Sequence, residues 1–370
     1  MKKMKLFTCV ALGALGVAAL ASCSNSATST STSANSNTSA AKKTTINVQF
    51  VPSRDPGTLA TLASNLEPLL NATSDKYDFK ITTGTSYAAT TEAMLSGQID
   101  VGFLTASGYA EATLKHEGKV EVLLTSVRKG YQVQIDYSGE ANQIKAMNGE
   151  MSGYEYLGQQ STEDVNYYCS TLIVKNEYYK DANGDGKIDV KDLAGLKIAR
   201  QGTTSGAGYL RPLKYLNDYG MSMVDKITDS KTQIQGVQYT GYDAALQGMM
   251  QGDVAGYWGF MDVRYTNGYN KEGSEYYQKK SIFTDTKCIA ITDGIYNDTI
   301  SVRSGLSDDA KEAVKNAFMT VVKQGSTTEE GTGAYYLYNL YSHTGYTVAN
   351  DSDFDGERAF YTYCNDHNLI

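Results

Sequence analysis

Three short stretches of the 370-residue chain combine glycines with small hydroxyl side chains. Each lies where an apolar, strand-like run gives way to a helical pattern: TGTSYAAT (83–90), TASGYAEAT (105–113) and QGTTSGAGYLRP (201–212). A helix start leaves N–H groups unpaired and carries about half a unit of positive charge, so it accepts an anion. Glycine permits close approach, and Ser or Thr adds an uncharged donor. One such turn is an ordinary helix cap. Three together predict a site for a tetrahedral oxyanion.

A second chemical signal is the acidic stretch DANGDGKIDVKD at residues 181–192. Oxygen ligands stand at the calcium-loop positions 1, 3, 5, 7, 9 and 12, with Gly186 at position 6. The ligands are Asp181, Asn183, Asp185, the carbonyl of Lys187, Asp189 and Asp192. No long helix precedes the loop, so a sensor-type opening of two helices is not expected. We predict a structural Ca²⁺ site, and the alternative is a solvated acidic turn.

The elements that position these stretches alternate between strand and helix patterns along most of the chain. TTINVQF, YDFKITT and IDVGFL read as strands, and amphipathic helical segments follow each of them. This alternation predicts an α/β fold with two mixed, mostly parallel sheets flanked by helices. From about residue 131 to 168 the pattern is too irregular to assign.

About 325 residues follow the N-terminal region, which is more than one core usually serves. We therefore expect two lobes, 43–170 plus 295–370 and 171–294, with the acidic loop 181–192 as an insertion in the second lobe. A ligand cleft is expected between the lobes.

The N-terminal region has the features of a secreted and anchored protein. Residues 1–22 combine lysines, a short apolar run and small residues, as a signal peptide does. The run Leu20-Ala21-Ser22-Cys23 resembles a bacterial lipobox, so Cys23 is expected to carry lipid and to anchor the protein to the cell membrane. Residues 23–42 are rich in Ser, Thr and Asn and are expected to be a flexible tether. An ordinary secreted protein is the alternative.

Charge and cysteine content limit the partners. The formal net charge is −8, and removing the three signal-peptide lysines would bring it to −11, which argues against nucleic-acid binding. Outside the signal region and Cys23 there are three cysteines, so at least one is free. Cys169 and Cys288 lie on strand-like runs, where either a disulfide or two buried thiols would fit.

The sequence offers little for catalysis. None of the three histidines, His116, His343 and His367, has metal-site spacing, and no G-x-S-x-G motif occurs. The serine in TTSGAG has no evident base, so we do not expect an enzyme. The acidic loop resembles one dockerin repeat, but an assembly module of that kind needs two.

Five segments, in order, resemble the phosphate/phosphite/phosphonate substrate-binding proteins of ABC transporters. They are VPSRDPGTLATLASNLEPLL, YAATTEAMLSGQIDVGFLTASGY, DLAGLKIARQGTTSGAGYLRP, GYDAALQGMMQGDVAGYWG and DGIYNDTISVR, within residues 44 to 320. The resemblance implies a type II periplasmic-binding-protein fold. It also implies an extracytoplasmic receptor that closes around a phosphorus oxyanion and delivers it to a permease. A sulfonate or a thiamine-type precursor is the alternative ligand on the same fold.

The resemblance and the helix starts together nominate ligand-binding residues. By position, Tyr87 and Tyr109 resemble pocket-wall tyrosines of the family, and the helix starts add their neighbours. Tyr242-Asp243 replaces a His-Glu pair, Asp262 lies near an acidic position that faces the ligand's amino group in some members, and Asp298 belongs to a strand end that has lost two prolines. The predicted set is Ser86, Tyr87, Ser107, Tyr109, Thr203, Thr204, Ser205, Tyr242, Asp243, Asp262 and Asp298.

Three further residues have two interpretations each. Arg54 follows the first strand and could clamp an anion, but a surface arginine paired with Asp55 or with solvent is the expected role. Tyr257 and Trp258 lie on an apolar strand and are expected to pack in the core rather than to line a pocket.

Overall fold

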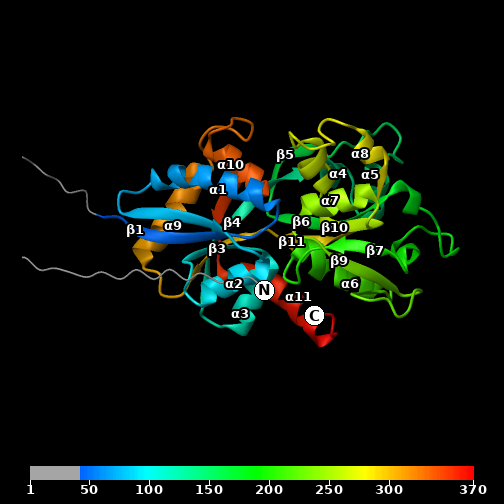
Figure 1. The fold of residues 1–370 in the computed structure, drawn as a ribbon, viewed down its shortest axis with the longest axis horizontal. Coiled ribbons are helices and arrows are strands. Elements are labelled where there is room, and N and C mark those ends of the chain that lie inside the picture. The colour runs from blue at the N-terminus through cyan, green and yellow to red at the C-terminus, as the bar shows by residue number, and fades with distance from the viewer. Residues whose placement is uncertain (1–41) are drawn as a thin grey trace, which may run out of the picture. The chain divides into compact units, whose positions relative to one another are not determined.

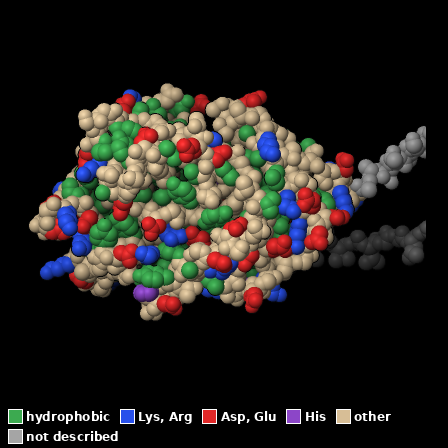
Figure 2. All heavy atoms as spheres, turned by 180° about the vertical axis from the view of Figure 1, so that it is seen from behind, with side chains coloured by type: hydrophobic (Ala, Val, Ile, Leu, Met, Phe, Trp, Pro, Cys, Tyr) green, Lys and Arg blue, Asp and Glu red, His purple; other side chains and the backbone are tan. Residues whose placement is uncertain are grey.

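The computed structural model describes residues 42–370, which form two lobes around two separate sheets (Figure 1). The predicted signal peptide, Cys23 and nearly all of the tether lie outside the described residues. Within residues 42–370, no helix combines the length and the apolar character needed to span a bilayer. On the face drawn in Figure 2, acidic and basic side chains are interspersed.

The first lobe is built on a sheet with the strand order β13-β4-β12-β3-β1-β2, and β5 pairs with β4. Its strands are β1 (Thr44–Phe50), β2 (Tyr77–Thr83), β3 (Val101–Leu104), β4 (Val120–Tyr131), β5 (Gln160–Val165), β12 (Thr299–Arg303) and β13 (Gly345–Val348). β1 runs parallel to β2 and β3, whereas β12 is antiparallel to β3 and β4. The helices of this lobe are α1 (Pro56–Asn71), α2 (Tyr87–Leu95), α3 (Ala106–Lys115), α9 (Asp308–Val321) and α10 (Gly333–Tyr341).

Local sequence explains the first strand and helix of this lobe. Ile46, Val48 and Phe50 alternate along β1 and are buried in the core. Asp55 then caps α1 by accepting a hydrogen bond from the backbone N–H of Thr58, and a proline occupies the first helical position. Consequently the residues between β1 and α1 form a short, fixed turn beside the lobe boundary.

The second lobe is built on a sheet with the strand order β11-β6-β10-β7-β9-β8. Its strands are β6 (Tyr167–Lys175), β7 (Lys197–Arg200), β8 (Ser222–Val224), β9 (Gln233–Gln238), β10 (Gly256–Phe260) and β11 (Thr286–Tyr296). Its helices are α6 (Arg211–Asp218), α7 (Tyr242–Gln251) and α8 (Ser281–Thr284), with the short segments η3 (Gly206–Leu210) and η4 (Arg264–Tyr269). Tyr257 and Trp258 are completely buried, which confirms their expected packing role.

The segment without a clear sequence pattern contains two helices, α4 (Gln132–Asp136) and α5 (Glu140–Met147). Val133, Met147 and Tyr156 join the core cluster of the second lobe, and the chain then returns to the first sheet as β5. These residues therefore pack on the second lobe, although the sequence boundaries placed them in the first. Their apolar positions are too few and too widely spaced to show a helical period.

The chain crosses between the lobes where β4 leads into α4, between α5 and β5, where β5 leads into β6 and where β11 leads into β12. A last helix, α11 (Asp355–Asp366), contacts both: it packs on α3 of the first lobe, and Phe360, Tyr361 and Cys364 cluster with Leu210 of the second. Cys169, Cys288 and Cys364 are all buried free thiols, so the alternative of a Cys169–Cys288 disulfide is not seen.

Candidate functional site

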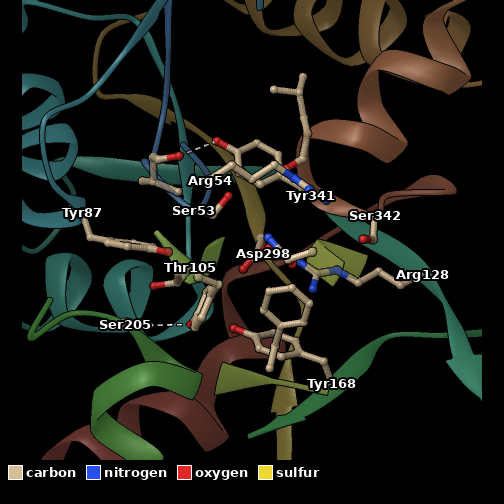
Figure 3. Close-up of a pocket in the computed structure, with 15 residues that line it drawn as sticks. Ser53, Arg54, Tyr87, Thr105, Arg128, Tyr168, Ser205, Asp298, Tyr341 and Ser342 are labelled. Carbon is tan, nitrogen blue, oxygen red and sulfur yellow. Dashed lines mark hydrogen bonds and ion pairs between the residues drawn. The ribbon is translucent and has the colours of Figure 1, made fainter. Parts of the chain in front are cut away.

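A small cavity lies between the lobes, and Figure 3 shows the side chains that surround it. Its volume is about 50 Å³, which suits a ligand head of only a few heavy atoms. We call it the inner cavity. The first lobe contributes Val51, Ser53, Arg54, Tyr87, Thr105, Arg128, Asp298, Leu340, Tyr341 and Ser342, and the second contributes Tyr168, Ser205, Tyr242, Phe260 and Asn267.

The three predicted strand-to-helix turns meet at this cavity. Tyr87 is the first residue of α2 and lines the wall. Thr105 caps α3 by accepting a hydrogen bond from Gly108 N–H at 3.0 Å, and it donates to the carbonyl of Thr204 in the other lobe at 3.1 Å. Ser205 is hydrogen-bonded to the Tyr242 hydroxyl at 3.2 Å. Each turn therefore supplies a hydroxyl residue to the cavity wall.

Arg54 is the most informative residue of the cavity. Its side chain is 7% exposed, and its Nε donates to the carbonyl of Leu340, in the last turn of α10, at 3.1 Å. It makes no ion pair with a described carboxylate, because the nearby Asp243 is bonded to Lys271 instead. Burial lowers the pKa of Arg54, yet a guanidinium stays charged at neutral pH. The expected surface pairing with Asp55 is therefore wrong.

The charge of a second arginine in the cavity is compensated by a carboxylate. Arg128 forms an ion pair with Asp298 and lies over the ring of Tyr168, with 4.8 Å from its guanidinium carbon to the ring centroid. Burial alone would raise the pKa of Asp298, but Arg128 and His343 outweigh it and hold that pKa below its usual value. Burial lowers the pKa of His343 to about 4, so its ring is neutral at physiological pH. The cavity consequently keeps one positive charge without an ion pair, that of Arg54, although Asp243 attracts it without forming an ion pair.

Neutral donors complete the wall. Burial raises the pKa of the phenols of Tyr87, Tyr168 and Tyr242, so each keeps its proton. The Oγ of Ser53 is buried and has no hydrogen-bond partner among the described residues. An anion in this cavity would thus meet one guanidinium and several O–H donors.

Four predicted residues line the cavity: Tyr87, Ser205, Tyr242 and Asp298. The other hydroxyl residues that were predicted in the turns do not line it. Ser86 caps α2 at Ala89 N–H, Thr203 is exposed, and Thr204 offers its carbonyl to Thr105. Ser107 donates to Glu357, and Tyr109 donates to Asp351 at 2.6 Å beside Phe354. Successive residues of a helix start point in different directions, so only one or two per turn face the ligand.

The two remaining acidic predictions have other partners. Asp243 accepts hydrogen bonds from Asn267, from Lys271 and from the backbone N–H of Asp55 in the other lobe. It does not line the inner cavity. Asp262 is fully buried and bonded to Arg264 and to the hydroxyl of Tyr156, 2.8 Å away. The expectation that Asp262 faces the ligand is corrected, because core groups occupy both of its oxygens.

The residues that sequence reasoning missed are Ser53, Thr105, Arg128, Tyr168, Asn267, Tyr341 and Ser342. They come from the ends of strands and helices far apart in the chain, such as β4, β6 and α10. Thr105 carried a usable signal, since it opens the second of the predicted turns. Ser53 stands in the family-like segment VPSRDPGTLATLASNLEPLL but was not nominated, and the other five lie outside any motif, so only the packing of the lobes brings them together.

The acidic loop folds around its own carboxylates. Asp181 accepts hydrogen bonds from the N–H groups of Gly184, Asp185 and Gly186, and Gly186 has the positive φ of +85° that favours glycine. Asp192 accepts from Ala182, Asn183 and Asp189. In residues 42–370, no three His, Cys, Asp or Glu side chains gather closely enough to hold a metal ion. The calcium site stays a prediction.

Two lobes around a small, hydrogen-bonding cavity with one free positive charge define a solute-binding protein of the two-lobed extracytoplasmic class. The family model described as "ABC transporter, phosphonate, periplasmic substrate-binding protein" matches residues 48–354, and the chain belongs to this family. The predicted fold, the role as an ABC-transporter solute receptor and the absence of enzymatic function are thereby confirmed. No curated protein sequence matches the chain.

Solved structures show the same fold at low sequence identity. A binding-protein component of an ABC phosphonate transporter from Pseudomonas aeruginosa has 13% identity and a TM-score of 0.59, over 89% of this chain and 90% of its own. PhnD1 from Prochlorococcus marinus, in complex with methylphosphonate, has 13% identity and a TM-score of 0.58, over 88% and 99%. The aliphatic sulphonate binding protein SsuA from Escherichia coli reaches 12% and 0.50, over 89% of each chain.

Proposed function

We propose that the inner cavity captures a phosphorus oxyanion, either phosphate, phosphite or the head group of a phosphonate, for delivery to the permease. The observation that carries this proposal is the burial of Arg54 without a carboxylate partner. A buried charge that is unpaired costs several kcal/mol, so the closed arrangement needs an anion beside Arg54. The donors around it favour a ligand with several acceptor oxygens.

The roles divide by chemistry. Arg54 holds its Nε on Leu340, which leaves both terminal nitrogens for two ligand oxygens in a forked arrangement. The hydroxyls of Tyr87, Tyr168 and Ser205 donate to the remaining oxygens. Asp298 accepts a hydrogen bond from a protonated ligand oxygen, while Arg128 keeps its carboxylate ionised.

Ligand binding is coupled to closure of the lobes. The cavity has walls from both lobes, and Thr105 and Asp55 of the first lobe are already bonded to the second through Thr204 and Asp243. A ligand that contacts both lobes at once favours the closed state over the open one.

The test is isothermal titration calorimetry with phosphate, phosphite, methylphosphonate, 2-aminoethylphosphonate and taurine. Arg54→Met keeps the side-chain stem and removes the charge, so it should weaken every phosphorus oxyanion at least a hundredfold. Arg303→Met is the matched control, because Arg303 pairs with Asp100 away from the cavity. Unchanged affinity in Arg54→Met would contradict the proposal.

The second candidate ligand is a sulfonate. The single net positive charge of the cavity suits a monoanion, and this observation favours it. A sulfonate has no protonated oxygen that could donate a hydrogen bond to Asp298, however, so one of its oxygens would be repelled by that carboxylate. Heat from taurine alone, among the five ligands, would replace the phosphorus assignment with this one.

We also propose that Cys23, which lies outside the described residues, is acylated and anchors the protein to the membrane. The lipobox-like run Leu20-Ala21-Ser22 before it supports this. Wild type expressed in a bacterium should label with a clickable fatty acid and enter the detergent phase, whereas Cys23→Ser should do neither. Equal labelling of both proteins would contradict acylation at Cys23.

We further propose that residues 181–192 bind one Ca²⁺, which stabilises the connection between β6 and β7. The ligand spacing supports this, together with the wrapped backbone around Asp181 and Asp192. The carboxylates would turn from backbone N–H groups towards the ion.

A further inference from the structure

A second and larger cavity shares two wall residues with the inner cavity. Arg54 and Ser342 line both spaces. The volume of the second cavity is about 370 Å³, against about 50 Å³ for the inner cavity. We call it the outer groove. A ligand head beside Arg54 in the inner cavity is therefore one side chain away from a space large enough for an organic group.

The outer groove is formed by both lobes. Tyr335 and Tyr338 come from α10 of the first lobe, and Leu62 comes from α1. Tyr277 and Lys271 come from the segment between η4 and α8 of the second lobe. A group in the groove would contact both lobes, as the oxyanion does in the inner cavity, and would add to closure.

The groove walls combine three tyrosine rings with polar side chains that include Glu272, so they offer contact surface to a planar group and disfavour a second anionic one. Tyr277 exposes 40% of its surface although it is aromatic, and the Tyr338 ring is held in place by the hydrogen bond from its hydroxyl to Gln160 at 2.9 Å. Lys271 is paired with Asp243 at 2.8 Å, so its charge is already compensated. Tyrosine rings give large contact areas to aromatic groups at little entropic cost.

The junction between the two spaces is suited to a linked ligand. Arg54 is fixed there because its Nε is bonded to Leu340 at 3.1 Å. Ser342 directly follows α10 and is the smaller of the two residues that line both spaces. For an oxyanion bound by the terminal nitrogens of Arg54, a fourth substituent that needs no hydrogen bond would reach the outer groove by passing Ser342.

We infer that the ligand is a phosphoryl compound with an aromatic or other planar organic substituent, bound with the oxyanion in the inner cavity and the substituent in the outer groove. The inference rests on the proposed function of the inner cavity. It adds the class of substituent and assigns selectivity to Tyr277 and Tyr335, which touch no part of the oxyanion site.

The test compares methylphosphonate with phenylphosphonate by calorimetry on the wild type and on the double variant Tyr277→Ala, Tyr335→Ala. Wild type should bind phenylphosphonate at least tenfold more tightly. The double variant should lose this preference and still bind methylphosphonate within about twofold of wild type. Tyr363→Ala, on α11 outside both cavities, is the control and should keep the preference.

The outcomes separate this inference from the proposed function. If wild type binds methylphosphonate but shows no preference for phenylphosphonate, or if the preference survives in the double variant, the groove assignment is overturned and the oxyanion site stands. If folded wild type binds neither phosphonate, phosphate nor phosphite, both fall together. Circular dichroism on each variant establishes that it is folded.

Discussion

The carboxylate of Glu357 in α11 and the guanidinium of Arg211 at the start of α6 form a buried ion pair with 2.5 Å between their atoms. The same carboxylate accepts hydrogen bonds from Ser107 in the first lobe and from the backbone N–H of Tyr296 near the lobe crossing. Glu357 lies just beyond the part of the chain that the family model matches. The C-terminal helix therefore holds both lobes together through residues that do not line the inner cavity.

Removal of the Glu357–Arg211 ion pair should lower the free energy of unfolding. Glu357→Ala leaves Arg211 buried and unpaired, so the free energy of unfolding should fall by about 3 kcal/mol. Denaturant titration measures it. The double variant Glu357→Ala, Arg211→Met should recover part of the loss, because it removes the unpaired charge. A double variant less stable than Glu357→Ala would contradict this account. Glu312→Ala, in an exposed pair with Lys315, should cost under about 0.5 kcal/mol.

Alanine substitutions at two neighbouring residues of the turn at 203–205 should have very different effects on ligand affinity. Ser205→Ala removes a hydroxyl from the cavity wall and should weaken oxyanion binding by about 1–2 kcal/mol. Thr204→Ala should change affinity by less than twofold, since only the Thr204 carbonyl is used. Calorimetry at a temperature where both variants are folded checks this. Equal losses in the two variants would show that the Thr204 hydroxyl also reaches the ligand.

The Asp262–Arg264 pair should affect stability and leave binding unchanged. Both side chains are fully buried, and Arg264 donates to Asp262 from Nε and from a terminal nitrogen. Asp262→Asn leaves the guanidinium without its counter-charge, so unfolding should become easier by about 3–5 kcal/mol. Folded Asp262→Asn should bind phosphate and methylphosphonate as wild type does. A selective loss of affinity for 2-aminoethylphosphonate would restore the earlier ligand role of Asp262.

The free energy of unfolding should decrease as the pH is lowered, because His343 has a lowered pKa in the folded protein. Its folded pKa is about 4, below the usual 6.5, so the unfolded chain binds a proton first as pH falls. Above pH 6.5 the neutral ring makes its full contribution to the free energy of unfolding. Between pH 6.5 and about pH 4 that free energy should decrease by about 2–4 kcal/mol in total. Asp298, Arg128, Tyr341 and Tyr346 surround the ring.

The measurement is the free energy of unfolding between pH 7.5 and 4.5 for wild type and for His343→Gln. The glutamine variant does not titrate, so its curve should be flatter in this window. Asp298 contributes at lower pH: its pKa is depressed, so its stabilisation is present above about pH 4 and is lost as pH falls through its folded pKa. Identical slopes for the two proteins would show that His343 is not the titrating group.

Calcium removal should lower the melting temperature and leave ligand affinity nearly unchanged. The acidic loop lies between β6 and β7, and none of its residues lines the inner cavity. Scanning calorimetry with Ca²⁺ and with a chelator measures the shift, and Asp181→Ala should abolish it. No shift in wild type would dismiss the metal site. A large affinity loss in the folded, chelated protein would indicate regulation by calcium instead.

The sequence by itself determined the α/β class, the two-lobed family fold and the three turns that meet at the inner cavity. These features depend on local signals: alternation along strands, helix caps and glycines at strand ends, which act over a few residues. Ser205 was found this way, whereas Tyr87, Tyr242 and Asp298 were nominated mainly by their positions in the segments that resemble the family.

Only the tertiary structure decided which side chains are buried together. Arg54 follows β1 by a few residues, yet its partner Leu340 is 286 residues away, and no local pattern reports that contact. Asp262 has the expected place in the chain but turns into the core towards Arg264. Residues 131–168 lack a clear period; α4 and α5 were assigned only by packing against the second lobe, and β5 only by pairing with β4 of the first. The direction of a side chain depends on which distant surface covers it, and that is settled when the lobes assemble.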